Sequence, residues 1–142
     1  MTVLFDTDVL VAFLNHRDGR HETAAHMVRE ISSGRWGTPL ITDYVLDEAL
    51  TLLMARGAGL AAADRLLSMV AAKSEGGAGP RLLIWRVDES VFSEAILLFR
   101  RHFARGLSFT DCTTLALVGA MGVDFVASFD HGFDGLVSRV SA

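Results

Sequence analysis

The fold class is decided by the stretch Thr2-Val3-Leu4-Phe5-Asp6-Thr7-Asp8-Val9-Leu10-Val11-Ala12-Phe13-Leu14. Residues 2–6 predict a buried strand, and residues 8–14 predict a short helix that ends before a polar loop. Asp6 directly continues the apolar strand, which places it at the strand's carboxyl end. Open α/β sheets bind their ligands at that edge, so Asp6 is the first candidate site residue.

Strand-like and helix-like segments alternate along the rest of the chain. The sequence predicts further strands over residues 36–42, 82–87, 123–129 and 136–140, and helices over residues 21–31, 43–56, 61–72, 88–104 and 108–121. Residues 74–80 have the composition of a surface loop. The alternation favours the α/β class, as three α/β/α layers around a mostly parallel sheet of roughly five strands. At 142 residues, we expect one domain over residues 1–142.

The composition indicates the compartment and the oligomeric state that we expect for the protein. Hydrophobic residues make up 51% of the chain, yet the longest uncharged apolar runs fall far short of the roughly 20 residues that span a bilayer. The apolar surplus therefore indicates a core and a subunit interface, and we expect a homodimer. No secretory signal precedes the first strand, which favours the cytoplasm and no membrane partner. The lone cysteine, Cys112, excludes an internal disulfide and a cysteine zinc cluster.

The charge of the chain limits how it could meet nucleic acid. A net charge of −4 argues against a protein that coats nucleic acid nonspecifically. It allows an enzyme that bridges phosphates to carboxylates through a metal ion. Among the 13 cationic side chains, Lys73 is the single lysine and the others are arginine. This bias fits phosphate contacts or a skewed genomic base composition equally well.

Four carboxylates occupy positions that the flanking sequence predicts to be apolar and inward-facing: Asp6, Glu48, Asp111 and Asp130. Acidic side chains are rarely buried without a partner. If the fold brings them together, each close pair repels by roughly 4 kcal/mol at 4 Å and an effective dielectric of 20. Several such pairs would rival a domain's stability of about 5–15 kcal/mol. Such a cluster must hold cations or protons.

Apart from Asp6, the acidic positions also have simpler structural interpretations, and for Asp130 this is a turn-rich loop over residues 128–135. Glu48 lies on the margin of the apolar face of helix 43–56, where its stem could pack while its head reaches water. Asp111 is the third residue after Ser108, an arrangement that resembles a capping box. Asp8 or Thr7 is expected to cap the first helix, a role that leaves Asp6 unexplained.

The histidines add no ligand set to these carboxylates. His16, His21, His26 and His102 have no ligand-like spacing, and His131 is of interest because it follows Asp130. Oxygen ligands without a histidine and cysteine set are the kind that Mg²⁺ or Mn²⁺ prefers, and zinc is not indicated.

At this point the pattern resembles the PIN domain family and, within it, the VapC-type toxins of toxin–antitoxin pairs. The resemblance covers nearly the full chain and rests on four short motifs in order: Leu4-Phe5-Asp6-Thr7-Asp8-Val9-Leu10-Val11, Val45-Leu46-Asp47-Glu48, Leu107-Ser108-Phe109-Thr110-Asp111, and Ser128-Phe129-Asp130 with Phe133. It implies a metal-dependent endoribonuclease that uses one or two Mg²⁺ or Mn²⁺ ions, and a cognate VapB-type antitoxin besides the RNA substrate.

The resemblance also implies residue roles. The family's acidic quartet carries over to Asp6, Glu48, Asp111 and Asp130 as catalytic and metal-binding residues, and its small hydroxyl carries over to Ser128. Two departures matter. The family often has Asn or Ser at the position of Asp8, so this chain has an additional acid there. Asp134 is a further acid near Asp130, and we favour Asp130 because it ends the strand.

Two other functions explain part of the sequence. A haloacid-dehalogenase-type phosphatase could use Asp6 and Asp8, but the Gly-Thr expected after the second aspartate is Val9-Leu10, and the required lysine could only be the badly placed Lys73. A catalytically inactive PIN-like binding module is the other alternative. Its mark would be a missing acid, and all four are present.

Overall fold

The computed structural model describes residues 1–71 and 80–140, which form a five-stranded parallel sheet. The strands are β1 (Thr2–Phe5), β2 (Thr38–Thr42), β3 (Leu83–Trp85), β4 (Phe125–Ala127) and β5 (Arg139–Val140), in the spatial order β3-β2-β1-β4-β5. The prediction of a parallel sheet of roughly five strands is confirmed. Because β1 lies at the centre, its carboxyl end faces the middle of one sheet edge.

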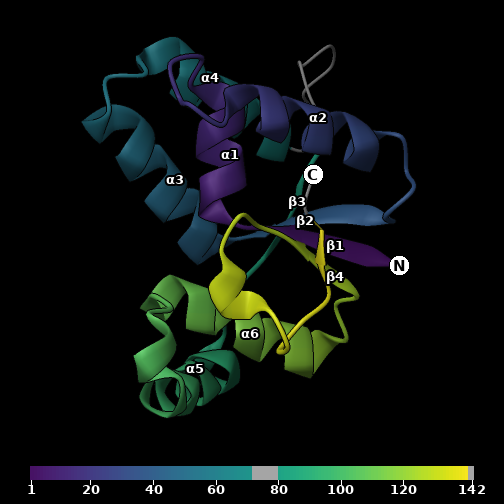
Figure 1. Cartoon of the computed structure of the whole chain (residues 1–142), viewed down its shortest axis with the longest axis vertical. Helices are drawn as coiled ribbons and strands as arrows, with labels where there is room; N and C mark the ends of the chain where they lie inside the picture. The colour runs from purple at the N-terminus through teal and green to yellow at the C-terminus, as the bar shows by residue number, and fades with distance from the viewer. Residues whose placement is uncertain (72–79, 141–142) are drawn as a thin grey trace.

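Helices cover both faces of the sheet, which confirms the three-layer prediction (Figure 1). α1, α2, α3 and α4 lie on one side, and α5 and α6 lie on the other. Their bounds are α1 (Thr7–Leu14), α2 (His21–Ser32), α3 (Asp43–Ala55), α4 (Leu60–Val70), α5 (Glu89–Arg101) and α6 (Phe109–Met121). Two 3-10 turns, η1 (Phe103–Arg105) and η2 (His131–Phe133), follow α5 and β4.

The alternation of side chains along β1 builds two cores. Val3 and Phe5 are fully buried among residues of α1 to α4, whereas Leu4 is fully buried among residues of α5 and α6. This is the period of two that a strand imposes, and it explains why β1 is apolar throughout. The helix α1 packs against α2 and α3 and is buried almost all round. β1 and α1 are therefore held firmly.

The register between β1 and β4 determines which residues lie side by side at the carboxyl edge of the sheet. Phe5 pairs with Ala127, and the Asp6 backbone N–H donates to the Ala127 carbonyl at 2.9 Å. The chain therefore leaves the two strands side by side, with Asp6 next to Ser128. Residues far apart in sequence are brought together by strand pairing alone.

The prediction that Asp8 or Thr7 caps the first helix is wrong. α1 begins at Thr7 and its N-cap is Asp6, whose carboxylate accepts a hydrogen bond from the Thr7 backbone N–H. Asp6 therefore has the local structural role that the sequence assigned to Asp8 or Thr7. Thr42, Asp88 and Ser108 cap α3, α5 and α6, respectively.

Several predicted elements are shorter in the structure. The strand predicted over 36–42 begins at Thr38, because Gly37 has a φ of +86° that does not continue a strand. The strands predicted over 82–87, 123–129 and 136–140 are limited to the residues that pair with a neighbouring strand, which are Leu83–Trp85, Phe125–Ala127 and Arg139–Val140. The helix predicted to reach Ala104 ends at Arg101, and the loop predicted over 74–80 lies outside the described residues except for Pro80. Apolar runs thus overestimate strand length.

Within residues 1–71 and 80–140, no helix has the length and apolar character needed to cross a membrane.

Candidate active site

The four predicted carboxylates line one cavity of about 220 Å³ at the carboxyl edge of the sheet. Asp6 follows β1, Asp130 follows β4, Glu48 projects from α3, and Asp111 projects from the first turn of α6. Asp8 also lines the cavity, as do Thr7, Leu52, Ser108, Arg20 and Arg56. The convergence expected from the sequence is therefore present, with a fifth carboxylate added.

Asp6 is the most deeply placed of these acids, with 4% of its surface exposed. One carboxylate oxygen accepts the Thr7 backbone N–H at 2.8 Å, and the other accepts the Ser128 hydroxyl at 2.6 Å. Burial raises the pKa of Asp6 well above its usual value, and the nearby charges of Asp8 and Asp111 raise it further. A cation in the cavity would relieve this penalty.

Asp111 both caps its helix and faces the cavity. Its carboxylate accepts the Ser108 backbone N–H at 2.8 Å, and the Ser108 hydroxyl accepts the Asp111 backbone N–H at 3.0 Å. This confirms the predicted capping box. Burial, followed by the charges of Asp130 and Glu48, raises the pKa of Asp111 to about 6. Capping and an electrostatic role in the cavity thus coexist in one side chain.

Asp8 connects α1 to the segment after β4. One of its oxygens accepts the Phe129 backbone N–H at 3.1 Å, while the other, Oδ1, is buried without a hydrogen-bond partner among the described residues. Burial raises the pKa of Asp8, the Arg20 charge opposes that rise, and the charge of Asp130 adds to it. A buried acceptor without a donor is costly, so this oxygen is suited to an additional ligand such as a cation or an ordered water.

Ser128 joins two of the acids. It is fully buried; its hydroxyl donates to Asp6 and accepts the Asp130 backbone N–H at 2.9 Å. Asp130 in turn accepts the Gly132 backbone N–H at 2.8 Å, which begins η2. One hydroxyl therefore fixes the orientation of Asp6 and the backbone that presents Asp130.

If the site performs the RNA cleavage that the family resemblance implies, the replacement Ser128→Ala is expected to lower that cleavage by about 10- to 100-fold, because groups that orient metal-binding side chains typically contribute that much. The fold should persist, because the substitution removes one oxygen from a small buried side chain. Cleavage rates and circular dichroism of both proteins measure the two effects. A rate equal to that of the parent would show that the hydroxyl does not orient Asp6.

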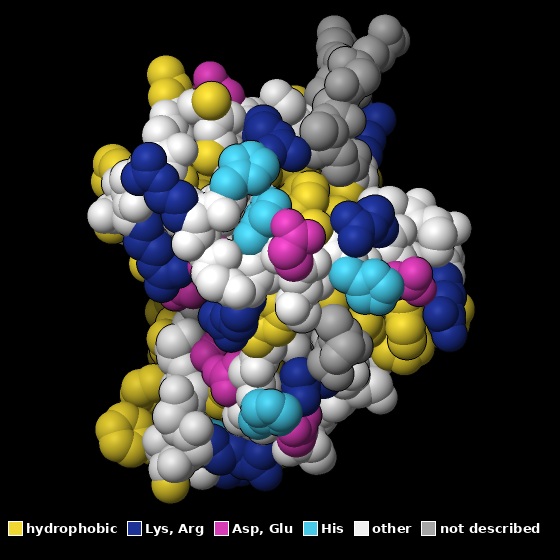
Figure 2. Space-filling view, turned by 45° about the horizontal axis from the view of Figure 1, so that its top comes forward, with side chains coloured by type: hydrophobic (Ala, Val, Ile, Leu, Met, Phe, Trp, Pro, Cys, Tyr) yellow, Lys and Arg dark blue, Asp and Glu magenta, His cyan; other side chains and the backbone are white. Residues whose placement is uncertain are grey.

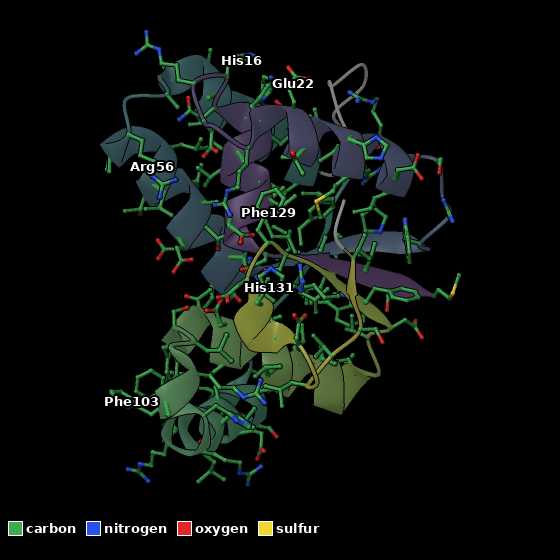
Figure 3. The ribbon with its side chains drawn as sticks, in the orientation of Figure 1. His16, Glu22, Arg56, Phe103, Phe129 and His131 are labelled. Carbon is green, nitrogen blue, oxygen red and sulfur yellow. The ribbon has the colours of Figure 1, made fainter. Side chains whose placement is uncertain are left out.

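Asp134 lies outside the cavity, and Asp130 is the acid that faces it. The exposed Asp134 pairs with Arg139 at 2.8 Å and with His131 at 2.9 Å. Its hydrogen bond from Arg139, then that from His131, lowers the pKa of Asp134 to about 2. Figure 3 shows His131 on η2, beyond Phe129 along the same segment. His131 and Asp134 thus brace the loop that presents Asp130.

Comparison with known proteins identifies the family to which this fold and sequence belong. The sequence matches the PIN domain profile over residues 3–137. The chain belongs to the PIN domain family. The resemblance to the PIN domain that the sequence motifs indicated is confirmed.

The relatives of this PIN domain include VapC proteins. A VapC ribonuclease of Archaeoglobus fulgidus is 28% identical over 134 residues, which cover 94% of this chain and 80% of the relative. The crystal structure of Mycobacterium tuberculosis VapC20, a sarcin-ricin loop cleaving toxin, superposes with a TM-score of 0.77 at 25% identity over 99% of each chain. VapBC2 of Rickettsia felis, bound to a promoter DNA fragment, gives 0.67 at 14% identity over 99% of this chain and 98% of that chain, a likeness of fold.

The donor set of this PIN domain fits a hard divalent cation. Carboxylates and a buried acceptor without a donor converge, and the pKa values of Asp6, Asp8 and Asp111 are all raised by burial. Within the described ranges 1–71 and 80–140, no three His, Cys, Asp or Glu side chains already stand as a ligand set. This arrangement fits Mg²⁺, which keeps several waters and binds one or two carboxylates directly.

Two residues of the PIN domain cavity, Arg20 and Arg56, were not singled out from the sequence. Arg20 stands at the beginning of α2 and Arg56 at the end of α3. The arginine bias of the composition was the only sequence signal, and it did not distinguish these two from the others. Their positions depend on how α2 and α3 pack beside the sheet edge.

Proposed function

We propose that this PIN domain is a metal-dependent endoribonuclease, the toxin of a VapBC-type pair, that hydrolyses RNA phosphodiester bonds. The observation that carries the proposal is the convergence of Asp6, Glu48, Asp111 and Asp130 in one cavity of a PIN fold. The VapC ribonuclease and the VapC20 toxin found among its relatives support the same function.

Asp6, Glu48, Asp111 and Asp130 would hold one or two Mg²⁺ or Mn²⁺ ions, directly or through water, with Asp8 as an additional acid. When bound, the ions supply a water of lowered pKa and neutralise charge on the phosphate and the leaving oxygen. Asp6 is the central member of this set. It is the most buried of the acids, and the charges of both Asp8 and Asp111 raise its pKa.

The remaining residues position these carboxylates. Ser128 orients Asp6, and the Ser108 backbone N–H holds one oxygen of Asp111. The Phe129 backbone N–H holds one oxygen of Asp8, which leaves its buried second oxygen for a ligand. A constellation fixed in this way needs little rearrangement when substrate binds, as preorganised electrostatic catalysis requires.

The proposal includes the partners and the setting. We propose that the chain functions as one domain in the cytoplasm, and as a homodimer whose interface uses part of the exposed apolar surface. Met54 and Leu60, near the ends of α3 and α4, are each 76% exposed. A cognate VapB-type antitoxin would inhibit the enzyme by placing a C-terminal segment in the acidic cavity, with an arginine against the carboxylates.

Cleavage of structured RNAs, with and without EDTA, tests the function. A fragment that contains the sarcin-ricin loop is the first substrate to try, because VapC20 is a toxin that cleaves that loop. We expect cleavage with Mg²⁺ or Mn²⁺, its complete loss in EDTA, and recovery when the divalent ion is restored in excess. Gel mapping of the products, with calorimetry of Mn²⁺ binding, measures activity and metal uptake separately.

Cleavage that persists in EDTA would overturn the metal dependence. Absence of cleavage across a panel of structured RNAs, together with absence of Mn²⁺ uptake, would favour the inactive binding module instead.

A further inference from the structure

We propose that Arg20 and Arg56 form an arginine clamp, which binds the RNA phosphates beside the scissile one. The inference rests on the proposed ribonuclease function and adds to it the residues that hold the substrate. The clamp is defined by these two side chains, which line the same cavity as the five carboxylates.

In the part of the chain that the structure describes, Arg20 is held in place by contacts that use none of its guanidinium N–H groups. Its guanidinium carbon lies 4.4 Å from the centre of the Phe129 ring, and its backbone N–H donates to Asp18 at 2.9 Å. Among the described residues, the ion pairs involve other arginines and histidine, and none involves Arg20. Stacking on an aromatic face orients a guanidinium plane without using its N–H groups, which remain available for a phosphate.

Arg56 also lines the cavity, directly after the end of α3. Its guanidinium lies 3.8 Å from the second carboxylate oxygen of Asp18, which is too far for a hydrogen bond. Half of the Arg56 side chain is exposed. Asp18 thus stands between the two arginines, fixing the backbone of one and attracting the guanidinium of the other. Figure 3 shows Arg56 on α3, on the same side of the sheet as α1 and α2.

The charge balance of the cavity explains why a clamp is needed. Asp6, Asp8, Glu48, Asp111 and Asp130 surround the reaction site, and the whole chain has a net charge of −4. The proposed metal ions would offset this charge at the scissile phosphate, whereas the neighbouring phosphates need cationic side chains of the protein. Guanidinium groups match phosphate bidentately, so Arg20 and Arg56 are suited to that contact.

A second cavity is lined by further arginines and by the residue that follows Arg56. It has a volume of about 230 Å³ and is lined by Arg17 and Arg65 together with Gly57, which directly follows Arg56. Figure 2 shows basic side chains spread over one face of the molecule, with acidic and histidine side chains between them.

The test compares Arg20→Ala with Arg35→Ala. Arg35 is a matched control, because its guanidinium also lies over an aromatic ring, that of Trp36 at 5.6 Å, but it does not line the cavity. With an RNA that the parent protein cleaves, we expect Arg20→Ala and Arg56→Ala each to raise KM about 10-fold with kcat nearly unchanged, since a lost phosphate contact weakens binding. Arg35→Ala should match the parent.

Two further readouts separate the clamp from a structural role. RNA affinity is measured at several salt concentrations in an Asp6→Asn background, which does not cleave the RNA. Adding Arg20→Ala should make the slope of log affinity against log salt less steep by about 0.7, the contribution of one phosphate contact to a single strand. Phe129→Leu should weaken RNA binding about 3-fold in the parent and have no effect when Arg20 is already alanine, because the ring acts through the guanidinium.

Unchanged KM and salt slope in Arg20→Ala, with cleavage intact, would refute the clamp and leave the ribonuclease function standing. Equal losses in Arg20→Ala and Arg35→Ala would also refute it, because the effect would then be one of net charge. Failure of the parent protein to cleave any RNA would instead refute the proposed function.

Discussion

Asp6→Asn is expected to lower RNA cleavage at least about 1000-fold while the chain keeps its fold, since a metal-centred transition state is stabilised by several kcal/mol and each 1.36 kcal/mol is tenfold in rate. Asp6 is the most buried acid of the cavity and is electrostatically linked to Asp8 and Asp111. Loss of its charge therefore removes the central member of the proposed ligand set.

The fold should tolerate this change because asparagine has the same shape. Its carbonyl oxygen can still accept the Thr7 backbone N–H that caps α1, and its amide can meet the Ser128 oxygen. The metal-free variant is also relieved of a buried charge, so its unfolding temperature should equal or exceed that of the parent. Single-turnover cleavage and thermal denaturation measure the two results.

Asp47→Asn is the matched control for this variant. Asp47 is exposed on α3, directly before Glu48, and does not line the cavity. It undergoes the same substitution and the same change of net charge, and should cleave RNA like the parent. Full activity in Asp6→Asn would remove Asp6 from the catalytic set, and a loss in both variants would point to net charge and not to the cavity.

The acidic residues at the sheet edge could be predicted from the sequence, because their positions depend on local patterns and on a general rule of parallel-sheet topology. Asp6 and Asp130 each follow an apolar run, and parallel strands present their carboxyl ends at one edge. Glu48 was placed by helix periodicity and Asp111 by the capping pattern after Ser108, and both line the cavity as expected. In each case a few neighbouring residues contain enough information to orient the side chain.

What the sequence did not predict depends on tertiary packing. The capping role of Asp6 was missed, because the first turn of α1 begins one residue earlier than the pattern indicated. Arg20 and Arg56 were not distinguished from other arginines, because their proximity to the carboxylates follows from how α2 and α3 pack. The stack of Arg20 on Phe129 likewise joins segments that no local pattern relates.

Asp111→Asn is expected to abolish most cleavage, by at least about 100-fold, and at the same time to stabilise the metal-free protein at pH 7. Burial and the charges of Asp130 and Glu48 raise the pKa of Asp111 to about 6, against an ordinary value of 3.8. At 1.36 kcal/mol for each unit, the ionised carboxylate destabilises the fold by about 2–3 kcal/mol. Asparagine keeps the cap through its carbonyl, so the unfolding temperature should rise by about 5 °C.

The pH dependence of the parent protein's stability tests whether the raised pKa of Asp111 is the cause. Because the folded-state pKa of Asp111 is raised, its proton stabilises the fold fully below pH 3.8, and this stabilisation is lost as pH rises through about 6. The metal-free parent should therefore gain stability between pH 7 and pH 5, and Asp111→Asn should gain less. The exposed helical Asp64 provides the control, since Asp64→Asn should follow the parent at both pH values.

Excess Mg²⁺ or Mn²⁺ should reduce or reverse the difference in stability between Asp111→Asn and the parent at pH 7. A cation in the cavity stabilises the parent in proportion to its binding, by RT ln(1 + [L]/Kd), and it binds Asp111→Asn less well. The advantage of the variant over the parent should then shrink or reverse when the divalent ion is added. If Asp111→Asn stabilises the protein equally in EDTA and in excess Mn²⁺, the Asp111 carboxylate does not bind the ion. A metal-binding carboxylate would destabilise the fold only in the absence of metal, because the bound cation would compensate its charge.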